Sequence, residues 1–214
     1  MEQKFYTIER GHQILISLLK QHNIKTIVAS PGATNVTFTG SIQHDPFFKI
    51  YSCVDERSAA YLAVGLAEES GEPVVLTCTG ATASRNYIPG LTEAYYRKLP
   101  ILAVTATQNE KRIGNLVPQM MDRSQQLKDM CVLSEHIAVP RDSDDEWDAT
   151  LRLNRAVLAL THRGGGPVHI NLATNYSRDF SVKELPVAKC IHRYTQLDAL
   201  PDMPNGRIAT LVGH

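Results

Sequence analysis

Short runs of apolar, often β-branched residues alternate along this chain with longer segments in which apolar residues recur every three or four positions. Continuous apolar runs are typical of strands that are covered on both faces, whereas the longer period is typical of helices that bury one face. Strands that alternate with helices predict a parallel sheet joined by right-handed crossovers. We therefore expect an α/β fold: a doubly wound, mostly parallel six-stranded sheet with helices on both faces.

The boundaries of the expected elements follow from the turn residues that interrupt this pattern. Strands are expected at residues 24–29, 47–52, 73–79, 100–106, 134–139 and 167–172. Helices are expected at residues 7–22, 56–70, 82–96 and 145–161. An acidic cluster at 142–148 precedes the last helix. We interpret it as a helix start with a capping box of Ser143 and Glu146 rather than as a cation site.

The pattern breaks down near residue 180, where a proline-containing stretch without a clear period begins. Such a stretch is typical of a linker or an extended surface arm. It leads to an apolar run that resembles the opening strand of another unit. We expect a domain over residues 1–180, a linker over 181–206 and the first strand of a truncated central domain over 207–214, as in an N-terminal fragment of a longer protein.

The charge balance narrows the possible classes of function. With 22 Lys and Arg against 22 Asp and Glu, the chain lacks the basic field that binding to nucleic acid or to an anionic membrane requires. Hydrophobic residues at 43% and charged residues at 21% indicate a folded protein. No apolar run approaches a membrane span, and the N-terminus lacks the apolar core of a secretory signal. We therefore predict a cytoplasmic protein with neither nucleic-acid nor membrane partners.

Cysteines and histidines show no recognisable metal-binding pattern along the chain. The 4 cysteines lie far apart without a C-x-x-C pair, and the 8 histidines form no H-x-H or H-x-x-x-H pair. Zinc sites and disulfide frameworks both need closer or more regular spacing. We therefore predict free, mostly buried thiols and no metal site.

Candidate chemistry lies in the loops after the predicted strands, because ligands of open α/β sheets bind beyond the carboxyl ends of the strands. These loops contain residues 30–33, 55–57, 79–82 and 106–108. Two of them carry glycine among small residues, which lets a ligand approach the backbone closely. The G-x-G-x-x-G and G-x-x-x-x-G-K-[ST] spacings are absent, so neither a dinucleotide fingerprint nor a P-loop is predicted.

Glu56 is the loop residue with two distinct interpretations. It opens an Ala-rich helix, where an acidic residue commonly does no more than stabilise the positive end of the helix dipole. It also lies at the predicted carboxyl edge of the sheet, where ligands of open α/β sheets bind. The motifs around Glu56 favour the second interpretation.

Six short motifs follow one another along the chain. They are Ser30-Pro31-Gly32, Asp55-Glu56 before the Ala-rich helix, Gly80-Ala81-Thr82 with Asn86, Glu93-Ala94-Tyr95 before Pro100-Ile101-Leu102, Pro118-Gln119-Met120-Met121-Asp122, and Gly166-Pro167-Val168. In this order and spacing they resemble the N-terminal pyrimidine-binding (PYR) domain of thiamine-diphosphate (ThDP) enzymes of the acetolactate synthase, pyruvate decarboxylase and MenD type. The resemblance covers about residues 8–180, and Ser30-Pro31-Gly32 with Asp55-Glu56-Arg57 is nearest to the MenD branch.

The resemblance implies a cofactor role for Glu56. In this family a carboxyl group hydrogen-bonds to the pyrimidine N1′ of ThDP and promotes the imino form of the 4′-amino group, which removes the C2 proton of the thiazolium ring. Further residues that the resemblance implies are Gly32, Thr79, Gly80 and Asn86 for cofactor binding and Gln119 for substrate binding. Arg57 and Arg85 either orient a substrate carboxylate or are simply solvated.

Two segments depart from the family pattern. Ala33-Thr34-Asn35 stands where the MenD branch usually has a basic residue after Ser-Pro-Gly. Gly80-Ala81-Thr82 replaces the family's Gly-Pro-Gly turn. The first departure affects the expected substrate contact, and the second affects the expected contact with the pyrimidine ring.

The other half of the cofactor site is expected elsewhere. The family binds Mg²⁺ and the ThDP diphosphate in a separate domain with a Gly-Asp-Gly motif and a downstream Asn, and this motif is absent here. We expect a chain that is inactive alone, forms a homodimer or tetramer through its PYR domain, and needs a pyrophosphate-binding domain in cis or on a partner subunit. The implied activity is that of a ThDP-dependent decarboxylase or carboligase acting on a small 2-oxo acid. The alternatives are a non-catalytic binding or assembly module and the PYR subunit of a split, two-subunit enzyme.

Overall fold

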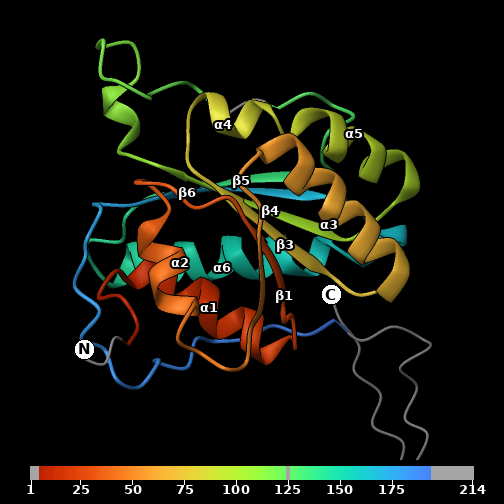
Figure 1. The fold of residues 1–214 in the computed structure, drawn as a ribbon. Helices are drawn as coiled ribbons and strands as arrows, with labels where there is room; N and C mark the ends of the chain where they lie inside the picture. The colour runs from red at the N-terminus through yellow and green to blue at the C-terminus, as the bar shows by residue number, and fades with distance from the viewer. Residues whose placement is uncertain (1–4, 124–125, 194–214) are drawn as a thin grey trace, which may run out of the picture.

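A six-stranded sheet runs through the centre of the molecule in the computed structural model, which describes residues 5–123 and 126–193 (Figure 1). Its strands are β1 (Thr26–Ala29), β2 (Lys49–Ser52), β3 (Val74–Cys78), β4 (Ile101–Thr107), β5 (Leu133–Ile137) and β6 (Val168–Ala173). They lie in the order β2-β1-β3-β4-β6-β5, and every neighbouring pair is parallel. All six predicted strands are present, and the expected fold class is confirmed.

Helices cover both faces of the sheet. They are α1 (Arg10–Gln21), α2 (Val36–Ile42), α3 (Glu56–Ser70), α4 (Thr82–Arg85), α5 (Ile88–Arg97) and α6 (Ser143–Ala159), with short 3₁₀ turns at Glu110–Arg112 and His162–Gly164. One face is covered by α1, α2 and α6, and the other by α3 and α5 (Figure 1). The loops after β1, β2, β3 and β4 therefore meet at one edge of the sheet. None of the helices in the described part of the chain is both long and apolar enough to cross a bilayer.

Two apolar cores separate the layers, because the strands bury side chains on both faces. Neighbouring residues of β4 face opposite ways, so that Leu102 belongs to one core and Ala103 to the other. The buried face of α3 consists of small residues, and a Cβ on Gly90 of α5 would lie only 2.6 Å from the Cβ of Ala60. This close approach holds α3 tightly against α5.

The single helix expected over residues 82–96 is wrong, because two helices, α4 and α5, occupy this segment and part at Asn86 and Tyr87. Pro89 lies in the first turn of α5 and has no backbone N–H to donate to the carbonyl of Arg85. A proline in this position starts a helix more readily than it continues one. The break was therefore signalled by the sequence.

The predicted elements did not include α2, because its β-branched residues and glycine disfavour a helix. Contacts with the segment after β6 outweigh this local preference. A Cβ on Gly40 would lie 2.5 Å from Cζ of Phe180, so the ring packs directly on the helix backbone. The Thr37 and Thr174 hydroxyls also lie 3.1 Å apart. This helix depends on residues that are distant in sequence.

The start of α6 differs from the expected capping box. The N-cap is Asp142 rather than Ser143, and its Oδ1 accepts a hydrogen bond from the backbone N–H of Asp145 at 2.9 Å. Glu146 pairs instead with Arg10 of α1, with 2.9 Å between Oε2 and Nη2. The acidic cluster thus caps one helix and links it to another.

Residues 177–193 form an extended arm that runs back along the α1 and α6 side of the domain, drawn in blue in Figure 1. The arm pairs with the N-terminal segment through an antiparallel bridge between Tyr6 and Val182. Farther on, the N–H of Ala188 donates to Oγ of Ser17 at 2.9 Å. The strand predicted at 207–214 lies outside the described residues, so the domain boundaries stay predictions.

Candidate functional site

The first loop at the carboxyl edge of the sheet follows β1, and Asn35 holds its shape. Oδ1 of Asn35 accepts a hydrogen bond from the backbone N–H of Gly32 at 2.8 Å, and its Nδ2 donates to the carbonyl of Ser30 at 3.1 Å. The Asn35 side chain is buried, so water does not compete for these bonds. The chain itself therefore fixes the conformation of this loop.

Two glycines bring the β1 loop against the loop that follows β3. A Cβ on Gly32 would lie 2.2 Å from Cγ2 of Thr79, so a larger residue does not fit there. The N–H of Gly80 donates to Oγ1 of Thr34 at 3.1 Å and joins the two loops. The structure thus brings together three residues that were predicted to bind the cofactor.

Glu56 begins α3 beside these loops, and its neighbour Asp55 performs the capping. Oδ1 of Asp55 accepts a hydrogen bond from the backbone N–H of Ser58 at 2.7 Å, which is the bond of an N-cap residue. Glu56 is half-buried and forms no hydrogen bond or ion pair with any other residue that the structure describes. Its carboxyl group is therefore available to a ligand.

The pKa values of two buried groups indicate where the Glu56 carboxyl group lies. Burial above all raises the pKa of the Cys78 thiol to about 12, and the charge of Glu56 adds to this rise. Burial likewise raises the pKa of Tyr87 well above its ordinary value, with further contributions from Cys78 and Glu56. Because Cys78 ends β3, the Glu56 carboxyl group lies within electrostatic reach of the carboxyl end of this strand.

Asn86 and Gln119 differ in how they lie relative to the glycine loops. Asn86 follows α4, and its Nδ2 donates to the carbonyl of Thr82 at 3.5 Å. Gln119 lines a cavity of about 390 Å³. The other residues that line this cavity are Ala33, Thr34, Gln108, Pro118, Tyr176 and Arg178. Since Thr34 also accepts the hydrogen bond from Gly80, the cavity adjoins the glycine loops, whereas Asn86 makes no described contact with them.

Arg123 is a buried cation at the same edge that the sequence did not single out. It is only 3% exposed and forms no ion pair with a carboxylate in residues 5–123 and 126–193. Its Nη2 donates to the carbonyl of Ala106 at 2.9 Å, and its Nη1 donates to Oγ of Ser84 at 3.3 Å. Burial lowers its pKa to about 10. The guanidinium ties β4 to α4 and adds to this edge a positive charge that no carboxylate of the described residues pairs with.

The two arginines with open interpretations have different surroundings. Nη2 of Arg85 donates to the carbonyl of Asp122 at 3.1 Å, so this side chain helps to hold the backbone of the loop before Arg123. Arg57 is exposed. Neither arginine forms an ion pair within the described ranges, and a role in substrate binding stays a hypothesis for both.

The thiols agree only in part with the prediction. All 4 cysteines are free, as expected. Only Cys78 is fully buried, whereas Cys53, Cys131 and Cys190 are half-buried, so the expectation of mostly buried thiols is wrong.

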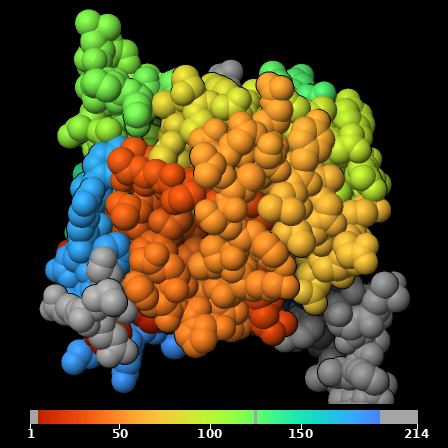
Figure 2. Space-filling view, viewed as in Figure 1, coloured from red at the N-terminus to blue at the C-terminus, as the bar shows by residue number. Residues whose placement is uncertain are grey.

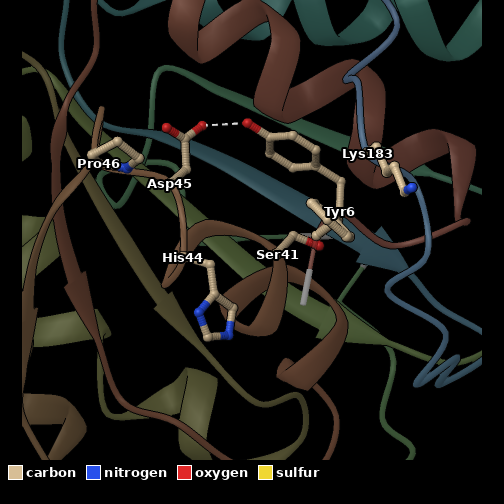
Figure 3. A pocket seen from close by; sticks show the side chains of 7 residues that line it. Tyr6, Ser41, His44, Asp45, Pro46 and Lys183 are labelled. Atoms are coloured by element: carbon tan, nitrogen blue, oxygen red, sulfur yellow. Dashed lines mark hydrogen bonds between the residues drawn. The ribbon is translucent and has the colours of Figure 1, made fainter. Parts of the chain in front are cut away.

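A second, smaller cavity of about 150 Å³ lies away from this edge (Figure 3). Its residues Asp45 and Pro46 lead into β2 at the opposite end of that strand from Glu56. Oδ2 of Asp45 is already engaged, at 2.6 Å from the Tyr6 hydroxyl and 2.6 Å from Nζ of Lys20. Partial burial opposes the effect, but the bonds from Lys20 and Tyr6 hold the pKa of Asp45 below its ordinary value. We therefore assign this cluster a structural role.

Replacing Gly80 with alanine should distort the predicted cofactor site. The new Cβ would lie 2.4 Å from the carbonyl oxygen of Ala106 and 2.9 Å from Nη1 of Arg123. Because a strand carbonyl cannot move far, we expect a loss of about 1–3 kcal/mol in the free energy of unfolding. The matched control is Gly65→Ala on α3, where a Cβ meets nothing within 4 Å and should stabilise the helix by up to about 1 kcal/mol. Urea unfolding measures both, and equal stabilities would contradict the close approach.

Comparison with protein families defines the class to which this fold and edge belong. Residues 9–127 match the family described as thiamine pyrophosphate enzyme, N-terminal TPP binding domain. The chain belongs to this family, and the resemblance to the PYR domain of ThDP enzymes is confirmed.

Two curated relatives of this chain are synthases with the same name. The 2-succinyl-5-enolpyruvyl-6-hydroxy-3-cyclohexene-1-carboxylate synthase of Bacteroides thetaiotaomicron is 34% identical over 194 residues, which is 90% of this chain and 35% of that protein. The synthase of the same name from Geobacillus kaustophilus is 33% identical over 158 residues, which is 73% of this chain and 27% of that protein. The chain thus spans about a third of the length of these curated relatives.

A solved structure is similar in fold. The thiamine diphosphate-dependent 4-hydroxybenzoylformate decarboxylase of Rhodococcus jostii RHA1 matches with a TM-score of 0.68 at 20% sequence identity. The match covers 86% of this chain and 34% of that one. At this level of identity the likeness establishes the fold alone.

Proposed function

We propose that this chain is the pyrimidine-binding part of a ThDP-dependent enzyme that decarboxylates a small 2-oxo acid and transfers the product to a second carbonyl. The observation that carries the proposal is the state of the Glu56 carboxyl group. It is half-buried, and it does not cap α3 because Asp55 does. It has no partner among the described residues and lies beside two loops in which glycine exposes the backbone. An acid that served only the helix dipole would need none of these features.

The residues at this edge fit the pyrimidine half of ThDP. A flat ring needs a surface without projecting side chains, and the close contacts of Gly32 with Thr79 and of Gly80 with Ala106 leave no room for a Cβ. The ring nitrogen needs a carboxyl group, which Glu56 supplies. When bound, ThDP provides a carbon nucleophile for the carbonyl of a 2-oxo acid. The part of Glu56 is to hold a hydrogen bond to the ring nitrogen and to share a proton with it.

The cavity beside the glycine loops supports the choice of a carboxylate substrate. Gln119, which was predicted to bind substrate, lines this cavity together with Gln108 and the exposed Arg178. A guanidinium and two amides can together orient a carboxylate and a carbonyl oxygen. The curated relatives are named as synthases, which supports transfer to an acceptor rather than simple release of an aldehyde.

We further propose that Mg²⁺ and the diphosphate bind to a second domain, in cis or on a partner subunit, and that PYR domains pair through α3 and α5. On these helices Tyr61, Leu62 and Tyr96 are 49%, 39% and 70% exposed. In Figure 2, α3 and α5 lie open on the near face, with no other element above them in that view. An open face with aromatic and aliphatic side chains is typical of a protein–protein interface, and supports a homodimer or tetramer.

Activity of the full-length protein tests this function. Protein incubated with ThDP, Mg²⁺ and a panel of small 2-oxo acids should release CO₂, and a chelator should stop the release until Mg²⁺ is restored. Residues 1–214 alone should release none. Binding of ThDP without turnover of any 2-oxo acid would favour the non-catalytic module. Activity that requires a separately encoded protein would favour the split enzyme.

A further inference from the structure

Three side chains of the kinds that bind metals meet where the arm crosses the C-terminal end of α1. His22 follows α1, and Cys190 and His192 belong to the arm. Their ligand atoms all lie within 4.8 Å of one another. Sγ of Cys190 is 3.2 Å from Nε2 of His22, and the two imidazole ring centroids are 5.3 Å apart. The cluster joins segments that are 168 positions apart in sequence, so the fold alone creates it.

Hydrogen bonds to the backbone hold Cys190 in place on both sides. The buried Asn154 of α6 donates from Nδ2 to the carbonyl of Lys189 at 2.8 Å and accepts at Oδ1 from the N–H of Ile191 at 2.7 Å. Two residues before Cys190, the arm donates a backbone N–H to Oγ of Ser17 on α1 at 2.9 Å. The thiol is therefore presented to α1 by the protein itself, as a pre-organised ligand would be.

The spacing suits a tetrahedral ion. With metal–sulfur bonds of about 2.3 Å and metal–nitrogen bonds of about 2.0 Å, the ligand atoms of a tetrahedral zinc ion lie about 3.3–3.6 Å apart. The 3.2 Å between Cys190 and His22 is close to this spacing. His192 is exposed, so rotation of its side chain can bring its ring nitrogen within range of the other two.

The donor set selects the kind of ion. One thiol and two imidazoles are ligands that Zn²⁺ favours, whereas Ca²⁺ and Mg²⁺ require oxygen ligands. Neither His22 nor His192 pairs with a carboxylate in the described part of the chain, so no acidic group competes for them. Three protein ligands leave one position for water.

We propose that His22, Cys190 and His192 bind a divalent transition-metal ion of the Zn²⁺ class, which fastens the arm to α1. The ion would replace the contact between the Cys190 thiol and the His22 ring with bonds to both. Because the unfolded chain has no such cluster, bound metal stabilises the folded state. The metal therefore sets how firmly residues 188–193 hold to the domain.

Cobalt(II) is the probe for this site, because its spectrum reports both geometry and thiolate ligation. Titration of the full-length protein with Co²⁺ should give tetrahedral d–d bands and a sulfur-to-metal charge-transfer band, and should release about one proton from the thiol. Zn²⁺ should displace the Co²⁺ signal and raise the melting temperature. Cys190→Ser should abolish the charge-transfer band, and His192→Gln should weaken binding at least about tenfold.

Matched controls are available among residues outside the cluster. Cys131→Ser and His44→Gln remove another half-buried thiol and an exposed imidazole, and both should bind Co²⁺ as the unaltered protein does. His192 is exposed, so His192→Gln should fold normally and keeps the test independent of folding. The proposal is overturned if the unaltered protein gives no charge-transfer band. It is equally overturned if Cys190→Ser or His192→Gln binds as tightly as the controls.

Discussion

Glu56→Gln in the full-length protein should slow the exchange of the C2 proton of bound ThDP by about 10²- to 10⁴-fold, the range that general acid–base groups contribute. Glutamine keeps the size of the side chain but cannot share a proton with the pyrimidine nitrogen. Asp55 still caps α3 in this variant, so the helix should form normally. Hydrogen–deuterium exchange at C2, quenched with acid and read by NMR, measures the rate.

A control on the same helix separates catalysis from helix stability. Glu69→Gln changes an exposed acid near the other end of α3, and should leave the exchange rate unchanged. If Glu56 acted only on the helix dipole, Glu56→Gln would cost about 0.3–1 kcal/mol of stability and would not alter exchange. Normal exchange in Glu56→Gln with ThDP bound would therefore refute the catalytic role and leave the dipole role.

Acidification should destabilise the folded domain, and His169 should account for about 1.4 kcal/mol for each pH unit below its ordinary pKa. Burial, followed by the charges of Arg123 and Arg85, lowers the pKa of His169 from 6.5 to about 3. The neutral ring is held between the hydroxyls of Thr105 and Ser134, each 2.8 Å from a ring nitrogen. Protonation of this ring is therefore unfavourable in the folded state but not in the unfolded state.

The direction of this effect follows from proton uptake. Between pH 6.5 and pH 3 the unfolded chain binds a proton at residue 169 that the folded chain does not. Stability from this group is complete above pH 6.5 and is lost progressively as the pH falls toward 3. Burial lowers the pKa of His12 to about 3 as well, which adds to the slope.

Variants isolate the contribution of His169. As the pH is lowered, the free energy of unfolding of His169→Gln should fall less steeply than that of the unaltered protein, by about 1.4 kcal/mol per pH unit. This variant should nevertheless be less stable at neutral pH. The exposed His44 provides the control, since His44→Gln should keep the full slope. Urea unfolding at a series of pH values between 4 and 7 gives the three slopes. Identical slopes in all three proteins would contradict a neutral buried ring at residue 169.

The parts of the fold that local chemistry determines could be predicted from the sequence. Helix α3 has the predicted bounds, because Asp55 caps its start and Gly71, with a φ of 67°, ends it. The central strands β3 and β4 are buried throughout, and their continuous apolar sequences predict this burial. Glu56 could be singled out as a candidate because it stands between a strand and a well-marked helix.

The parts that depend on distant residues could not be predicted. Helix α2 forms because Phe180 packs on Gly40, and nothing near residue 40 indicates that ring. Arg123 looks like any polar loop residue in the sequence, yet it is buried between Ala106 and Ser84. A position of this kind is visible only once the strands are assembled.

The expectation of no metal site also took no account of contacts between distant residues. It was based on spacing within single segments, whereas His22 and Cys190 meet only through the fold. Proximity in the folded chain, and not periodicity, is the signal that brings this cluster to notice. The proposed ligation at these residues is therefore one that spacing rules are unable to find.

The position of α1 has a consequence for synthesis. This helix leaves the ribosome before the other described elements, yet it packs against α6 and the arm, which are made more than 120 residues later. Until they emerge, the side chains of Leu15, Leu18 and Leu19 lack part of their native cover. A nascent chain of this protein that pauses before α6 should therefore be a substrate for chaperones, and a pause after the arm should not.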